Sequence, residues 1–180
     1  MLTELWLPIL LSAVALFFAS FVSWMVLQLH RHDWRKLERE DEFLEAVRGV
    51  GLSRGNYMFP YCGTSAEMRS EEYQRKYEAG PRGVMTVLAN TFMGVNLALT
   101  FVYFLVVSFC LAYLATLALP RGAGFMPVFR FVSTAGLLTF LAAIVQHSIW
   151  FRVRIVGHVI ESVAYAAIVG AIFAGMWPSG

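Results

Sequence analysis

Four long apolar stretches constrain what this chain can fold into more than any other feature. They cover residues 6–29, 95–119, 128–151 and 155–177. An α-helix rises about 1.5 Å per residue, so about 20 residues cross a hydrocarbon core of roughly 30 Å. Each stretch reaches that length, and 58% of the 180 residues are hydrophobic, above the roughly 45–50% of soluble domains. The sequence therefore predicts an all-α integral membrane protein with four transmembrane helices.

The segment between the first two spans is the only one long enough to form a separate lobe. We expect a first transmembrane helix within residues 1–30 and a small helical and irregular lobe over residues 31–94. The first span is expected to remain in the membrane, because no basic residue precedes it and its apolar run exceeds the roughly 7–15 residues of a signal peptide. The lobe is of marginal length for a hydrophobic core of its own.

The basic residues predict how the chain lies across the membrane. Ten of the fourteen Lys and Arg residues lie between Arg31 and Arg82, and Arg152 and Arg154 lie in the last short turn. With four spans these two segments share one side, and short loops rich in Lys and Arg stay in the cytoplasm. We therefore expect a multi-pass protein of the bacterial inner (plasma) membrane, with the lobe in the cytoplasm and both termini on the opposite side.

Within the lobe the sequence predicts two helices. Trp34, Leu37, Leu44 and Val47 form one apolar stripe, which predicts an amphipathic helix that continues from the first span along the membrane surface or along a partner. Residues 70–81, SEEYQRKYEAGP, combine a serine cap, two acidic residues in the first turn and a Gly-Pro stop. This pattern predicts a complete short helix.

The rest of the lobe is expected to be irregular or to lie at the membrane surface. Residues 52–65 are rich in turn formers and carry the aromatic residues Tyr57, Phe59 and Tyr61. Because Pro60 and the nearby Gly-Asn pair oppose a helix, we expect an irregular segment whose rings pack against another surface. Residues 82–94 are too polar and too close to the second span to cross separately, so they are expected at the interface.

Small residues recur every four positions in the first and last spans. Such rows let helices approach closely in lipid, where no hydrophobic force draws them together. They predict packed helix faces, either inside a compact bundle or against another protein. The rows are Ala15, Ala19 and Ser23; Ala166, Gly170 and Ala174; and Ala167, Ala171 and Gly175.

Several residues together resemble a group of small multi-pass bacterial membrane proteins of uncharacterised activity. The resemblance covers the lobe and the last hairpin. It implies a recurrent cytoplasmic lobe, and it implies no activity. The residues that carry it are Gly55, Tyr57, Pro60, Cys62, Lys76, Tyr77, Gly80, Pro81, Ser148, Ile149 and Trp150.

The candidate site residues are His147, His158 and Glu161, near the cytoplasmic ends of the last two spans. If the turn is centred near Arg152, an antiparallel hairpin sets His147 opposite His158 at similar depth, and Glu161 shares a helix face with His158. The three side chains are interpreted as a metal site, as haem ligands, as part of a proton or ion path, or as a polar network at the wet end of the helices. In the last case Glu161 pairs with an arginine of the turn or a basic residue of the lobe.

Other kinds of site find no support in the sequence. Cys62 and Cys110 are expected in different media and lack a CxxC partner, so neither a structural disulfide nor a thiolate metal site is expected. No catalytic triad, phosphate-binding loop or paired-carboxylate set occurs at useful spacing. Acidic residues such as Asp41, Glu42 and Glu45 share the lobe with the basic ones. Hence neither nucleic acid nor a polybasic lipid-binding tract is expected.

We therefore expect a non-catalytic accessory or structural subunit of a larger membrane complex. Its partners would be other membrane subunits and the lipid bilayer, with homo-oligomers allowed, and no cofactor is expected beyond lipid contacts. The alternatives are an oligomeric ion or proton conduit that uses Glu161, and a haem- or metal-binding redox subunit that uses His147 and His158. The residues expected to make the interactions are Trp34, Leu37, Tyr57, Phe59, Tyr61 and Gly170.

Overall fold

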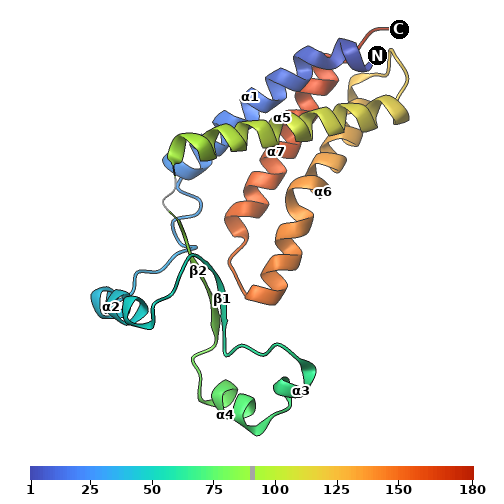
Figure 1. Ribbon diagram of the computed structural model, residues 1–180. Coiled ribbons are helices and arrows are strands. Elements are labelled where there is room, and N and C mark those ends of the chain that lie inside the picture. Colours follow the sequence, from blue (N-terminus) through green and yellow to red (C-terminus); the bar gives the residue numbers. More distant parts are fainter. Residues whose placement is uncertain (90–91) are drawn as a thin grey trace. The chain divides into compact units, whose positions relative to one another are not determined.

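Four helices of the structure are long and apolar enough to cross a membrane, as the sequence predicts. The computed structural model describes residues 1–89 and 92–180. These helices lie side by side in Figure 1, and together with residues up to Arg35 they form one compact unit, the bundle. The first rod consists of a 3-10 turn Leu2–Leu5, α1 Trp6–Phe21 and a π-helical turn η2 Val22–Val26; the others are α5 Met93–Ala118, α6 Phe125–Phe151 and α7 Val156–Gly175.

The first helix ends three residues before the predicted boundary at residue 29. After η2 the backbone of Gln28 takes a positive φ of 49°, which ends the helix and turns the chain back across its last turn. The Leu29 N–H then donates to the Ser23 carbonyl oxygen at 3.1 Å, so a backbone group at the reversal finds its partner on the helix itself. A helical pattern alone misses this turn, because residues 22–29 are mostly apolar up to Leu29.

The bundle is built around an α6–α7 hairpin, against which α1 and then α5 pack. The row Ala166, Gly170 and Ala174 is buried, and its glycine faces Ser133 and Phe129 of α6. The second row on α7, which ends at Gly175, is exposed. Of the two rows predicted in the last span, one therefore packs the hairpin internally and the other lies on the bundle surface.

The chain termini are held at the end of the bundle opposite the α6–α7 turn, where Figure 1 marks both of them. Arg121, in the loop between α5 and α6, pairs with Glu4. The indole of Trp177 donates to the Pro120 carbonyl oxygen at 3.0 Å, and the Gly122 N–H donates to that of Pro178 at 2.9 Å. This end is closed by contacts of the chain with itself.

The lobe, Lys36–Phe92, is a second compact unit. It contains an antiparallel hairpin that the sequence analysis did not predict, since it expected only helical and irregular structure there. The strands pair from Gly55 with Val87 to Phe59 with Gly83. In both strands the side chains alternate between two faces. A short aromatic stretch interrupted by turn residues does not show this alternation in the sequence. The elements are α2 Glu40–Val50, β1 Gly55–Phe59, α3 Ser65–Met68, α4 Glu71–Ala79 and β2 Gly83–Val87.

The two predicted lobe helices differ in outcome. The one over residues 70–81 is confirmed: Ser70 Oγ accepts from the Tyr73 N–H at 3.2 Å, and Gly80 ends the helix with φ +62°. The Lys76 ammonium, one turn from Glu72, holds the pKa of that carboxyl below its usual value. The stripe helix is wrong in its first part, because α2 begins only at Glu40 and leaves Trp34 and Leu37 outside it.

The lobe has almost no interior. Among its described residues none is buried, and the three helices likewise contain no buried side chain. Tyr61 is 76% exposed and Leu37 49%. Because burial of apolar surface is the main force that holds a domain together, the hairpin and its local hydrogen bonds are most of what stabilises this unit.

Replacing Gly170 by alanine is expected to destabilise the bundle. The added Cβ would collide with Ser133 Oγ and lie 3.2 Å from the Phe129 carbonyl oxygen; the serine can rotate away, but the backbone oxygen cannot. We expect a loss of about 1–3 kcal/mol in unfolding free energy, measured by reversible unfolding in mixed micelles. Gly175→Ala is the matched control on the same helix, since its Cβ would meet nothing within 4 Å. Equal stabilities of the two variants would contradict the close packing.

Candidate metal centre

His30 lies just beyond the first helix and is held inside the bundle. Its side chain is 3% exposed. The reversed chain lays the imidazole on the indole of Trp24, with centroids 4.1 Å apart and planes 19° from parallel. On the other side lies Gly157 of α7, where a Cβ would come within 2.9 Å of His30 Cε1. The glycine is therefore what leaves room for the ring.

The two nitrogens of His30 face two different carboxylates. Nδ1 is 2.7 Å from Asp33 Oδ2 and hydrogen-bonded to it, while Nε2 is 3.1 Å from Glu161 Oε2. The second pair is close but does not form a hydrogen bond, so Nε2 is a buried atom without a hydrogen-bond partner. The other oxygen of Glu161, Oε1, is also buried and without a partner. Since the Asp33 bond takes the Nδ1 proton, a neutral His30 presents its Nε2 lone pair toward Glu161.

His158 completes the cluster from the first turns of α7. Its Nδ1 is 3.7 Å from Glu161 Oε2. The His158 side chain is 33% exposed, so solvent reaches the cluster from this residue. The His158 and His30 rings are 4.4 Å apart between centroids. Two imidazoles and one carboxylate thus converge at the end of the bundle that carries the α6–α7 turn.

The cluster has the donor set and spacing of a metal site. Three possible ligand atoms lie within 4.8 Å of one another, one each from His30, His158 and Glu161. A tetrahedral zinc ion with bonds of about 2.0–2.1 Å places its ligands roughly 3.3 Å apart, and the separations of 3.1 and 3.7 Å lie on either side of that value. Asp33 supplies the carboxylate that commonly orients a metal-binding histidine through its other nitrogen.

The structure brings together only part of the predicted site. His158 and Glu161 are neighbours, as their spacing on one helix indicates. His147 is exposed, its ring contacts Phe151, and its place beside Glu161 is taken by His30. Within the described structure, Glu161 has ion-pair contacts with the two histidines instead of the arginine proposed from the sequence, because the basic residues of the turn lie outside the helix ends.

Sequence reasoning missed His30, Asp33 and Trp24. The available signal was an HRHD motif directly after an apolar span, with its first histidine three residues before an aspartate. That spacing is common in turns and says nothing about proximity to α7. The contact depends on the chain reversal at Gln28, which the sequence pattern did not indicate.

A cavity of about 200 Å³ extends from the cluster into the bundle. It touches all four long helices, and Glu161 and His158 form its polar end. Hydroxyl groups continue the polar lining as far as Ser20, Ser162 and Tyr165. Further along the helices the buried side chains are mainly apolar, such as Leu16, Val169 and Phe173, with isolated serines such as Ser12 and Ser108 among them. Haem ligation by both clustered histidines does not fit, because their adjacent rings leave no space for a porphyrin between them.

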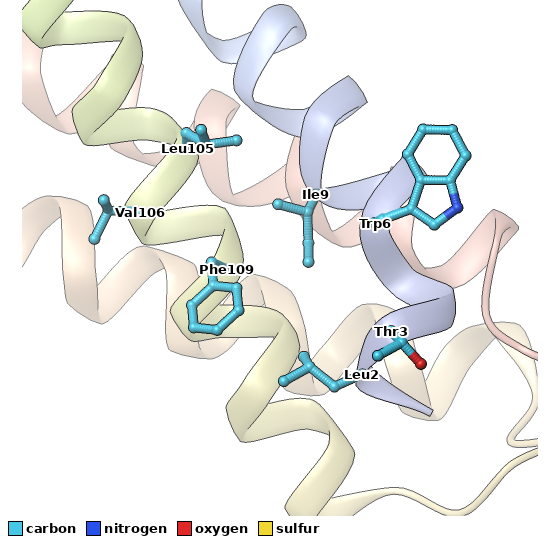
Figure 2. A pocket seen from close by; sticks show the side chains of 7 residues that line it. All are labelled: Leu2, Thr3, Trp6, Ile9, Leu105, Val106 and Phe109. Carbon is cyan, nitrogen blue, oxygen red and sulfur yellow. The ribbon is translucent and has the colours of Figure 1, made fainter.

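A larger hollow of about 550 Å³ lies near the other end of the bundle, between the start of the first rod and α5. Figure 2 shows the side chains that line it. They are apolar apart from the hydroxyl of Thr3 and the indole N–H of Trp6, and this hollow offers no donor set for a metal. They are Leu2, Thr3, Trp6, Ile9, Leu105, Val106 and Phe109.

In comparisons with known proteins, no family model matches the chain, and no curated protein or solved structure shows significant similarity to it. The chemistry assigned to the cluster therefore rests on its own geometry.

Proposed function

We propose that the chain is a non-enzymatic membrane protein that binds a divalent transition-metal ion through His30 Nε2, His158 Nδ1 and the Glu161 carboxylate. The observation that carries the proposal is that His30 Nε2 and Glu161 Oε1 are buried without a hydrogen-bond partner, in two side chains whose Nε2 and Oε2 atoms are only 3.1 Å apart. A buried polar atom without a partner costs roughly 1–3 kcal/mol. A cation bound by the imidazole nitrogen and by the carboxylate would offset this cost in both side chains.

The donor set limits which ion fits. Imidazole nitrogen and carboxylate oxygen suit zinc, cobalt, iron and related first-row ions, whereas calcium and magnesium prefer oxygen alone. Three protein ligands leave one tetrahedral position for water, which reaches the site from the partly exposed His158 side. Bound there, the ion would join the segment after the first helix to the start of α7 and stabilise the reversed chain.

Metal binding by the purified protein is the direct test. We expect Co²⁺ to bind and give visible d–d absorption, and Zn²⁺ to displace it. Loss of a hydrogen-bond partner of a ligand lowers metal affinity by roughly 10–100-fold, and we expect a loss of this size for Asp33→Asn. Glu161→Gln and His30→Gln remove a ligand itself, so they are expected to lower the affinity by more. His147→Gln is the matched control, since this histidine lies outside the cluster, and its affinity should equal that of the parent.

The main alternative is a doubly protonated His30 that pairs with Asp33 and Glu161 and needs no metal. In that case neither Co²⁺ nor Zn²⁺ would bind above the level of the Glu161→Gln variant, and metal analysis of the purified protein would show no enrichment. That result would overturn the proposal.

The space beside Gly157 that the His30 ring occupies gives a second test of the same site. Gly157→Ala places a Cβ 2.9 Å from His30 Cε1 and 3.1 Å from the Leu29 carbonyl oxygen, so the ring and the reversed chain must shift. We expect Co²⁺ affinity to fall at least about tenfold while helix content is kept, because ligand positions tolerate only tenths of an ångström. Gly175→Ala controls for a glycine change on α7. Unchanged Co²⁺ affinity in Gly157→Ala would show that His30 is not a ligand.

A second candidate role is that of an accessory subunit, favoured by the lobe. Exposed apolar side chains on a unit without buried residues form a surface that contact with another protein would cover. The predicted interaction residues Tyr57, Phe59 and Tyr61 belong to or follow β1 of this unit. On the orientation expected from the basic residues, the partner lies in the cytoplasm or in the membrane at its cytoplasmic face.

Hydrogen exchange distinguishes a docked lobe from a free one. In the purified chain in nanodiscs of its native lipids, we expect amides of α2 and the hairpin to exchange with opening free energies of about 0–2 kcal/mol. In native membranes the same amides should be slower. The α7 amides, inside the bundle, serve as the internal control and should not change. Equal lobe exchange in both preparations would contradict a protein partner.

A further inference from the structure

A hollow of about 630 Å³ opens at the end of the bundle that carries the α6–α7 turn. It is formed by the turn itself and by the segment that follows the first helix, both parts of the same compact unit. The wall combines charged and aromatic side chains. The lining residues are Trp24, Asp33, Trp34, Arg35, His147, Arg152, Val153, Arg154 and His158.

The charges of this hollow are unbalanced. Arg35, Arg152 and Arg154 face a single carboxylate, Asp33, which is already bonded to His30. Among the ion pairs of the described residues, none involves any of the three arginines. Arg154 is held by a bond from its guanidinium to the His32 carbonyl oxygen at 3.4 Å, which leaves its charge uncompensated.

Three guanidinium groups beside a single carboxylate that already binds a histidine form a site for an anion. Their planar donors match phosphate oxygens two at a time, and such charge-assisted bonds are about twice as strong as neutral ones. The left-handed conformation of Arg152, φ 55°, places the first of them at the C-cap of α6, two residues before Arg154. A phosphate group is the anion that best uses three arginines that line the same hollow.

The position of the hollow and its tryptophan side chains indicate which kind of molecule carries that phosphate group. Arg152 and Arg154 follow directly on the apolar helix α6, where a bilayer would place lipid headgroups, and Trp24 and Trp34 are of the type enriched at that level. Trp34 is 80% exposed and Trp24 47%, so both rings are available to glycerol and acyl carbons. We propose that this hollow binds the headgroup phosphate of an anionic phospholipid.

This site is distinct from a polybasic lipid-binding tract in the lobe, which the acidic residues of that segment argue against. It is formed by structure rather than by a run of basic residues, since Arg35 is more than a hundred positions from Arg152 in the chain. It shares Asp33 and His158 with the metal site, but it depends on the arginines and not on a bound ion.

Lipid retention tests the proposal on the full chain. The protein is placed in nanodiscs of equal parts phosphatidylcholine and phosphatidylglycerol, released in the gas phase, and its retained lipids are counted by native mass spectrometry. We expect phosphatidylglycerol to be retained preferentially and the preference to fall about fivefold for each arginine changed to glutamine, in Arg35→Gln, Arg152→Gln and Arg154→Gln. Arg69→Gln, an exposed arginine of the lobe, is the matched control and should keep the full preference.

Three outcomes would overturn the proposal. The first is equal retention of both lipids by the parent protein. The second is an undiminished preference in the double variant Arg152→Gln/Arg154→Gln with thermal stability unchanged. The third is binding of inorganic phosphate in detergent as tight as that of a short-chain phosphatidylglycerol, because the site would then recognise free phosphate and not a lipid.

Discussion

A polar group inside a lipid bilayer has no water to bind, and the rest of this structure depends on that constraint. It is why four long stretches are helices, whose backbone groups bind one another. It also makes each buried polar side chain informative, because a membrane protein keeps such a group only where a partner or a function offsets its cost. Most buried hydroxyls here belong to small serines. The cluster of His30, Glu161 and Asp33 is different, since it concentrates two carboxylates around one imidazole.

That cluster exists because the first helix does not continue to its predicted end. A π-helical turn over Val22–Val26 and a reversal at Gln28 return the chain toward α7. π-Turns are rare and often mark functional positions, and here the consequence is that a histidine from beyond the first helix is buried in the bundle. Gly157 on α7 is the complementary change, because only the absence of a side chain leaves space for the returning ring. Local backbone irregularity and one glycine together position the site.

What could be predicted from the sequence follows from how local each feature is. The four spans depend on length and apolarity, and the helix after Ser70 depends on its cap and stop, so both are readable within a few residues. The pairing of Glu161 with His158 needs only a helical repeat. By contrast, His30 meets Glu161 across 131 positions of sequence, through a reversal that no residue pattern announces. The hairpin of β1 and β2 was missed for a similar reason, since its strands are separated by two helices and pair without forming a buried core.

The two ends of the bundle differ in how their charges are satisfied. At the end with the termini, Arg121 has Glu4 as its partner. The loop is bound to the C-terminal tail by one backbone hydrogen bond and by the indole of Trp177. At the other end, carboxylates are drawn inward to the histidines, and the three arginines of the hollow are left outside them. The same separation of charge therefore supports both proposals: acidic oxygens face an inner site suited to a cation, and basic groups face an outer site suited to an anion. A chain that only had to span the membrane would gain more by pairing these charges with each other, as it does at the opposite end.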